Sequence, residues 1–233
     1  MSLKDNWEII EGDGYPNIGW GNGEAQCYKK ENVQFLDDGT IIITAKEEQC
    51  HTPQNFWYNY SSGKIKSKQT CSVKKGHVEA TIAVKAEHGI WPAFWMLPVG
   101  EETTWPKCGE IDIFEAKGRL ANSYFGSLHY LGAYNMHTCK SFTQEFIPGH
   151  TINIFHTYAL DWDEKEIRWY CDNKLIESIK KKDLLVSDKN PFLEDKQFYV
   201  IINLAVGGSF DNFQLPPMYT LPCQMIIQDI KIC

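Results

Sequence analysis

The sequence predicts an all-β fold, a jelly-roll sandwich of two antiparallel sheets. Many short runs rich in β-branched and aromatic residues are separated by turn signals at regular spacing, and almost no stretch has helical periodicity. The 233 residues show no internal repeat, linker or shift in composition. We therefore expect residues 1–233 to form a single domain.

In the first half of the chain, residues 5–28 are rich in glycine, asparagine and aromatics and predict a structured loop that leads into a short strand. Residues 33–36 and 40–45 predict a hairpin, because Asp38-Gly39 suits a tight turn between β-branched runs. Residues 61–64 predict another turn, and residues 77–84 alternate as a half-buried strand does.

In the second half, Pro92 excludes a helix interior, so residues 89–97 predict a loop entering a strand. The pair Asp172-Asn173 predicts the turn of a hairpin over residues 166–176. Residues 180–185 predict one helical turn. Further strands are expected at 123–130, 151–154, 155–162, 198–204 and 224–232.

Three carboxylates stand in one strand-like run, Cys108 to Glu115. Glu110 and Asp112 are two residues apart and so share a face of a regular strand. Glu115 lies five positions from Glu110, which would place it on the opposite face unless a β-bulge adds one residue. Bulges are frequent beside active sites, so the run predicts three carboxylates on one surface.

Paired carboxylates on one surface suit the hydrolysis of glycosides. A retaining glycosidase holds its two carboxyl groups about 5–5.5 Å apart, one as nucleophile and one as acid and base. The alternative is an edge strand whose charges only face water.

Composition narrows the classes of partner. The net charge of −7 and the lack of a basic block disfavour nucleic acid and anionic membranes as partners. No apolar run is long enough to span a bilayer. The high aromatic content serves a packed core, a sugar-binding surface, or both.

Cysteine usage bears on the compartment. The eight cysteines form no C-x-x-C pair, which argues against a zinc knuckle. An even number spread over a β-rich chain predicts disulfides and an oxidising compartment, with buried free thiols as the alternative. The sequon Asn59-Tyr60-Ser61 agrees with secretion. We expect an extracellular or secretory-pathway protein whose signal peptide is not part of this sequence.

Several motifs, taken in order, resemble glycoside hydrolase family 16, and in particular its laminarinase-type β-1,3-glucanases. The resemblance covers nearly the whole chain and rests on residues 21–26, 91–98, 109–115, 128–130, 155–162 and 203–208. The form Glu-x-Asp-x-x-Glu is similar to the bulged β-1,3-glucanase branch rather than to the unbulged lichenases. The resemblance implies a jelly roll with a concave substrate cleft.

By this resemblance Glu110 is the nucleophile, Glu115 is the general acid and base, and Asp112 tunes their protonation. Three close carboxylates cannot all ionise freely, so separated pKa values are expected. The reaction requires no metal or organic cofactor.

The same resemblance implies residues that bind the substrate. Trp105 looks like a stacking residue, Trp95 a residue of the cleft floor, and His129 a substrate contact, while Asn22 and Gln26 would line the cleft. Each tryptophan could instead belong to the core, and His129 could be a core histidine bonded to the backbone.

The chain departs from the family pattern at two of its binding positions. Lys64 stands where relatives often have arginine, and Phe210 stands near the place of a tryptophan. Asp229 matches a ligand of the structural calcium ion that the family often binds, but one aspartate is far from the roughly six to eight oxygens that calcium takes.

We therefore expect a secreted, retaining endo-β-1,3-glucanase that acts as a monomer on β-glucan, with activity on mixed-linkage β-1,3-1,4-glucan as a further option. Two alternatives stay open on the same scaffold, a non-catalytic β-glucan recognition protein and a transglycosylase. The presence of both Glu110 and Glu115 favours an enzyme over a recognition protein.

Overall fold

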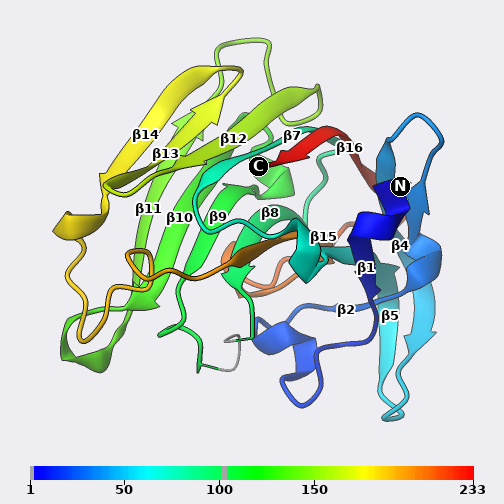
Figure 1. The fold of residues 1–233 in the computed structure, drawn as a ribbon. Coiled ribbons are helices and arrows are strands. Elements are labelled where there is room, and N and C mark those ends of the chain that lie inside the picture. Colours follow the sequence, from blue (N-terminus) through cyan, green and yellow to red (C-terminus); the bar gives the residue numbers. More distant parts are fainter. Residues whose placement is uncertain (1–2, 101–103) are drawn as a thin grey trace.

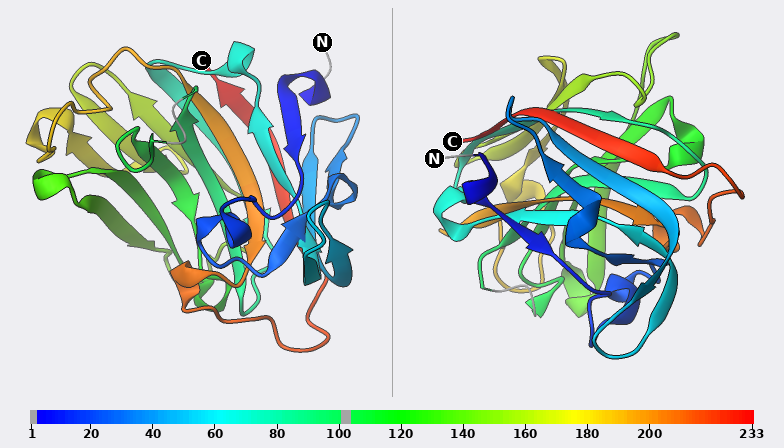
Figure 2. Two further views of the ribbon diagram at one scale, coloured as in Figure 1. Left: turned by 90° about the horizontal axis from the view of Figure 1, so that it is seen from below. Right: turned by 90° about the vertical axis from the view of Figure 1, so that its right-hand side faces the viewer.

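Two β-sheets pack face to face in the computed structural model, which describes residues 3–100 and 104–233 (Figure 1). Both sheets are curved, and the view from below shows them as two layers (Figure 2). The described residues contain no α-helix. The all-β sandwich predicted from the sequence is confirmed.

The first sheet has seven strands in the order β1-β6-β15-β8-β9-β10-β11. All of its neighbours are antiparallel. The strands span Trp7–Ile10 (β1), Lys64–Ser67 (β6), Phe198–Val206 (β15), Ile90–Pro98 (β8), Glu110–Glu115 (β9), Ser123–Leu131 (β10) and His137–Glu145 (β11).

The second sheet has nine strands, in the order β14-β13-β12-β7-β16-β4-β5-β2, with β3 paired to β4. The pair β2–β5 is parallel, which departs from the purely antiparallel sheets that we expected. The strands span Lys174–Lys180 (β14), Glu166–Cys171 (β13), His156–Trp162 (β12), Gly76–Val84 (β7), Cys223–Ile232 (β16), Ile41–His51 (β4), Trp57–Ser62 (β5), Gln26–Tyr28 (β2) and Val33–Phe35 (β3).

Short 3₁₀-helices connect the strands. They span Leu3–Asn6 (η1), Ile18–Gly21 (η2), Lys30–Asn32 (η3), Gln69–Cys71 (η4), Gly118–Leu120 (η6), Ala133–Asn135 (η7), Lys181–Asp183 (η8) and Ser209–Asp211 (η9). The helical turn expected at 180–185 is η8. None of the helices in the described residues is long and apolar enough to cross a membrane.

The core lies between the two sheets. The Phe114 ring of β9 packs 4.2 Å, centroid to centroid, from Tyr158 of β12, and the Tyr124 ring of β10 lies 5.0 Å from the same tyrosine. Trp169 of β13 is 1% exposed and donates a 2.8 Å hydrogen bond from Nε1 to the backbone oxygen of Asp112. The second sheet thus fixes the backbone of β9 from behind.

Most of the predicted strands and both predicted hairpins are confirmed. Val33 pairs with Ile43 in the first hairpin. In the second, Asp172 and Asn173 form the turn with positive φ angles of 50° and 63°, as a two-residue turn between twisted strands requires.

Two local predictions are wrong. Residues 151–154 form a turn rather than a strand, because the Ile154 N–H donates to the oxygen of Thr151 while Ile152 alone anchors the segment in the core. Residues 61–64 do not make a hairpin turn. There the chain passes from β5 in one sheet to β6 in the other, at Gly63, where an added Cβ would lie 2.7 Å from a methyl group of Val33.

A disulfide joins Cys27 of β2 to Cys50 of β4, with the two Cα atoms 6.2 Å apart. The other six cysteines are free thiols: Cys71, Cys108, Cys139, Cys171, Cys223 and Cys233. Both sequence-based alternatives for the cysteines therefore occur in one molecule.

Candidate active site

A β-bulge interrupts β9 at the position that the carboxylate spacing predicts. Phe94 of β8 pairs with Phe114, but its neighbour Trp95 pairs with Asp112, so Ile113 is the extra residue. The register with β10 shifts at the same place. The predicted bulge is confirmed.

The bulge gives β9 two distinct faces. Ile111, Ile113 and Phe114 belong to the core and are at most 1% exposed. Glu110 and Glu115 lie on the opposite side, and each accepts a hydrogen bond from the indole of a tryptophan. We call this side of the seven-stranded sheet the carboxylate face.

One tryptophan donates to each glutamate. Nε1 of Trp105, which is 45% exposed, lies 2.9 Å from Oε2 of Glu110. Nε1 of Trp91 lies 3.0 Å from Oε1 of Glu115. Each indole thus fixes one carboxyl oxygen and leaves the other oxygen of that glutamate for a different partner.

Asp112, which is 2% exposed, lies between polar groups of β10. Ser127 donates a short hydrogen bond from Oγ to Oδ2 of Asp112, and Nε2 of His129 lies 3.2 Å from the same oxygen. One ring nitrogen of His129 and one oxygen each of Asp112 and Glu110 lie within 4.8 Å of one another. These three groups therefore form one compact cluster.

Burial and mutual repulsion raise the pKa values of both glutamates. Loss of water, followed by the negative charge of Asp112, raises the pKa of Glu110 well above its usual value. The same two causes raise the pKa of Glu115 to about 8. The positive charge of His129 and the two indole hydrogen bonds act against this rise.

His129 is the cationic counterpart of these acids. Burial works against its charge, but the hydrogen bond and the charge of Asp112 raise the pKa of His129 to about 11. Its Nδ1 lies 2.8 Å from Nε2 of His137 on β11, and burial together with the charge of His129 lowers the pKa of His137. The pair is therefore an imidazolium that donates to a neutral imidazole. The Trp105 ring lies 4.7 Å from the His137 ring.

Lys64 of β6 is 7% exposed and sits among aromatic rings. Its Nζ lies 3.8 Å from the centroid of the Trp20 ring and 5.2 Å from that of Trp95. Burial lowers the pKa of Lys64 to about 8, and the charges of Glu24 and Glu110 oppose that fall. Lys64 is thus a buried cation with two carboxylates as its counter-charges.

A hydrogen-bonded network surrounds Glu24, which is 7% exposed. Its carboxylate accepts from the side chains of Asn22 (3.2 Å), Gln26 (2.7 Å) and Tyr28 (2.9 Å). The network continues through Asn203, whose Nδ2 donates to the Tyr28 hydroxyl over 3.1 Å.

This network fixes two of the residues predicted to bind substrate. Nε1 of Trp95 donates to Oδ1 of Asn203 over 2.7 Å. Gln26 is fully buried and its side chain bonds Glu24 and the backbone N–H of Val206, so it supports the network from behind instead of lining the surface. Asn22 is half-buried and stays beside the network's outer end.

Phe210 belongs to an aromatic cluster that includes Trp91, the hydrogen-bond donor to Glu115. Its ring stacks on Trp91 at 5.0 Å and meets Phe125 edge-on at 5.3 Å. Nζ of Lys117 lies 4.7 Å from the centroid of Phe210, and the charge of Lys117 acts to lower the pKa of Glu115.

Two groups among the described residues could hold a metal ion, and neither includes Asp229. One is the cluster of Glu110, Asp112 and His129, and the other is the group of His156, Cys171 and Asp172 on the second sheet. Asp229 is exposed, at the irregularity where β16 shifts its register against β7. A calcium ion there stays a prediction.

Sequence reasoning missed several residues of this site. The side chains of Trp91, Lys117, Ser127 and His137 all contact the predicted residues, yet none was singled out. Trp91 carried a signal, because it belongs to the motif at 91–98. His137 carried none, because it begins a strand whose residues are nearly all exposed or half-exposed and polar.

Comparison with known proteins finds glycoside hydrolases. The family model described as glycosyl hydrolases family 16 matches residues 22–214. A glucan endo-1,3-beta-glucosidase A1 from Niallia circulans is 36% identical over 223 residues, which cover 92% of this chain and 33% of that protein. This chain thus spans about a third of the length of that relative.

Two further similarities cover more of the other protein. A glucan endo-1,3-beta-glucosidase from Cryptopygus antarcticus is 32% identical over 90% of this chain and 77% of its own length. The laminarinase catalytic domain from Thermotoga maritima MSB8 superposes with a TM-score of 0.84 at 31% identity, covering 96% of this chain and 89% of that one.

Proposed function

The chain belongs to glycosyl hydrolase family 16, and from this premise we propose that it is a retaining endo-β-1,3-glucanase. The observation that carries the proposal is the bulge at Ile113, since it brings Glu110 and Glu115 to one face of β9. The similarity to endo-1,3-beta-glucosidases at 32–36% identity supports the choice of β-1,3-glucan as substrate.

In the proposed mechanism Glu110 is the nucleophile. Its carboxylate attacks the anomeric carbon, forms a covalent glycosyl-enzyme, and is displaced in the second step by water. The hydrogen bond from Trp105 and the charge of His129 favour the ionised form, and the charge of Lys64 acts in the same direction. These two cations act against the repulsion between Glu110 and Asp112, which raises the pKa of Glu110.

Glu115 is the general acid and base. Its pKa of about 8 keeps the carboxyl group protonated at neutral pH, as protonation of the leaving oxygen requires. After the first step the ionised Glu115 accepts a proton from the attacking water. The negative charge of Asp112 raises the pKa of Glu115 and so helps to keep its proton in place at neutral pH.

The glucan would lie along the carboxylate face between two aromatic groups. Trp105 beside Glu110 suits the sugar that is attacked, since an exposed indole offers a flat apolar surface to a sugar ring. The Trp91–Phe210 stack beside Glu115 suits the leaving portion of the chain. Lys64 and Trp95 would support the attacked side from beneath.

Secretion is part of the same proposal. The Cys27–Cys50 disulfide supports an oxidising compartment, because such bonds seldom persist in a reducing one. A glucanase acting on polymeric glucan outside the cell would meet its substrate there.

The experiment is a product assay on laminarin with the wild type and with Glu110→Gln and Glu115→Gln. We expect reducing-end sugars as a mixture of short oligosaccharides from the wild type, and at least about 10³-fold less from either variant. The matched control is Glu145→Gln, which removes an exposed carboxylate of the same sheet and should leave the rate unchanged. Glucan binding without any product from the wild type would overturn the proposal in favour of a recognition protein.

A further inference from the structure

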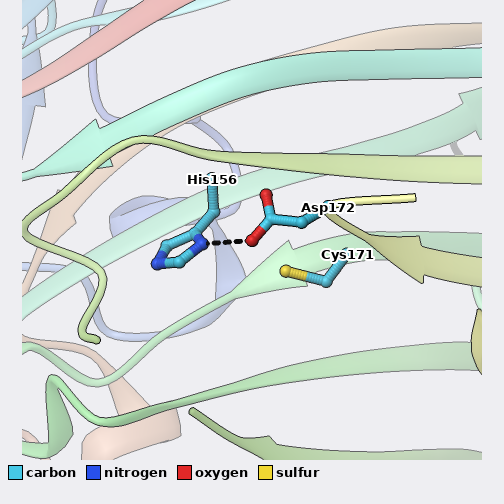
Figure 3. Close-up of side chains that lie close together, drawn as sticks. All are labelled: His156, Cys171 and Asp172. Carbon is cyan, nitrogen blue, oxygen red and sulfur yellow. Dashed lines mark hydrogen bonds and ion pairs between the residues drawn. The ribbon is translucent and has the colours of Figure 1, made fainter. Parts of the chain in front are cut away.

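A second cluster of metal-binding side chains lies on the nine-stranded sheet, where β12 begins and where β13 turns into β14. Figure 3 shows the imidazole of His156 and the carboxylate of Asp172 joined by a hydrogen bond, with the thiol of Cys171 beside them. One donor atom from each lies within 4.8 Å of the other two. The cluster plays no part in the proposed hydrolysis, so metal binding there can be tested independently of glucanase activity.

The backbone holds these three residues in place. Cys171 pairs with Tyr158 across β13 and β12, and the N–H of Asp172 donates to the oxygen of Thr157 over 2.9 Å. In return the Thr157 N–H donates to Oδ1 of Asp172 over 2.9 Å. Oδ2 of Asp172 is thereby directed to Nδ1 of His156, 2.6 Å away.

The burial of the cluster is that of a site with one open side. His156 is 3% exposed and Cys171 is 7% exposed, while the side chain of Asp172 is 53% exposed. An ion could therefore enter past the carboxylate and reach two buried donors. Imidazole, thiolate and carboxylate together are ligands of zinc, whereas calcium and magnesium take oxygen ligands.

We propose that Nδ1 of His156, Sγ of Cys171 and Oδ2 of Asp172 bind a zinc ion, with water as the fourth ligand. Tetrahedral zinc with these bond lengths sets its ligand atoms roughly 3.4–3.6 Å apart. The Nδ1–Oδ2 pair must open by somewhat under an ångström, which rotation of the exposed Asp172 side chain supplies. The thiol of Cys171 releases its proton to solvent, and the proton on Nδ1 of His156 moves to Nε2.

The nitrogen that takes this proton makes no other hydrogen bond within residues 3–100 and 104–233. Nε2 of His156 is buried and has no hydrogen-bond partner among the described residues. The ring of the exposed His150 lies 5.5 Å from the His156 ring, centroid to centroid. A rotation of the His150 side chain would let it accept a hydrogen bond from Nε2 of His156. A metal-bound histidine usually donates its second N–H in this way. Phe146 stacks on the His156 ring at 4.4 Å and holds its plane.

The bound ion would join the first residue of β12 to the β13–β14 turn. Because the ion binds only the folded arrangement of these segments, it should stabilise the chain by an amount that grows with the logarithm of its free concentration above Kd.

The test uses Co²⁺ as a spectroscopic probe in place of zinc, with Zn²⁺ titrated in competition. Thiolate-bound Co²⁺ gives an intense near-ultraviolet charge-transfer band, which oxygen and nitrogen ligands do not give. All proteins carry Cys139→Ser, since that exposed thiol lies 3.7 Å from Nε2 of His129 and could bind the probe itself. The matched pair is Cys171→Ser and Cys223→Ser, two substitutions of buried free thiols in one sheet.

We expect one Co²⁺ per chain with the thiolate band in the Cys139→Ser parent and in the Cys223→Ser variant, displaced by one equivalent of Zn²⁺. Cys171→Ser should abolish the band and weaken Zn²⁺ binding at least about tenfold. Asp172→Asn should weaken metal binding while keeping the thiolate band. This variant tests the site even if Cys171→Ser fails to fold. A band that survives in Cys171→Ser, or no band in the parent, would overturn the proposal whatever the glucanase assay shows.

Discussion

The indole N–H of Trp91 donates a 3.0 Å hydrogen bond to Oε1 of Glu115. An indole nitrogen only donates, so this oxygen accepts whether or not the carboxyl group is protonated. Because a carbonyl oxygen is the stronger acceptor, this hydrogen bond favours the proton of Glu115 on Oε2, the oxygen that remains for the leaving group of the substrate. The hydrogen bond from Trp91 therefore orients the carboxyl group of Glu115 as well as lowering its pKa.

Removing this donor should move the alkaline limb of the pH–rate profile. The hydrogen bond from Trp91 favours the ionised form and lowers the pKa of Glu115. In Trp91→Phe that pKa should therefore rise, the alkaline limb of kcat/KM should shift to higher pH, and the rate at the optimum should fall about tenfold. The control is Trp57→Phe, at an indole that is 65% exposed. A limb that stays in place or moves to lower pH would refute the role given to Trp91.

Replacing Glu115 by glutamine should stabilise the fold above its unfolded-state pKa. Burial and Asp112 raise the pKa of Glu115 from 4.5 to about 8. A carboxyl group whose pKa is higher in the folded state contributes stability at low pH and loses it as pH rises through the folded value. Glutamine avoids that loss. The variant should match the wild type near pH 5 and exceed it by on the order of 2 kcal/mol near pH 8.

Urea unfolding at the two pH values measures this difference. Glu145→Gln, at an exposed carboxylate, serves as the control and should show no change with pH. If Glu115→Gln were less stable than the wild type near pH 8, burial would not raise the pKa of Glu115 in the native state.

Lys64 should support the ionised form of Glu110. In Lys64→Met the cation beside the Trp20 and Trp95 rings is lost while an unbranched side chain of similar length is retained. The pKa of Glu110 should then rise, so the acid limb of kcat/KM should move to higher pH and the rate should fall at least about tenfold. Lys66→Met, a neighbour on the same strand, is the control. An unchanged acid limb would mean that Lys64 does not act on the nucleophile.

Asn203 should matter to both stability and substrate binding. Its side chain accepts from Trp95 and donates to Tyr28, and it is 5% exposed. In Asn203→Ala the half-buried Trp95 indole loses its acceptor, and the Tyr28 hydroxyl keeps only its hydrogen bond to Glu24, which should cost about 1–3 kcal/mol in the free energy of unfolding. Loss of the fixed Trp95 orientation should also raise KM more than it lowers kcat. The exposed Asn153→Ala provides the comparison in both assays. Equal stability would show that solvent replaces these hydrogen bonds.

The sequence could predict the bulge because the rule behind it is local. Side chains alternate strictly along a strand, so the odd spacing from Glu110 to Glu115 demands an extra residue if both face one side, and the core takes up Ile113. The hairpin turns at Asp38-Gly39 and Asp172-Asn173 were predictable for a similar reason, since their backbone angles depend on those residues themselves.

Other features depend on contacts that spacing does not encode. The direction of the Gln26 amide is set by Glu24 and by the backbone of Val206, 180 residues away in sequence. Strand β11 has little hydrophobic alternation, so its His137 could not be placed beside His129. Residues 151–154 looked like a strand because Ile152 and Ile154 are β-branched, but backbone hydrogen bonds close them into a turn.

The central claim, that Glu110 attacks and Glu115 transfers the proton, is tested most directly by azide rescue. Alanine variants of each are given a β-glucosyl substrate with an activated leaving group, and the azide products are resolved by NMR. If the claim holds, Glu110→Ala yields the α-glycosyl azide, because azide displaces the leaving group directly. Glu115→Ala yields the β-glycosyl azide, because azide attacks the glycosyl-enzyme. The reverse assignment of anomers, or no rescue of either variant, would contradict the claim.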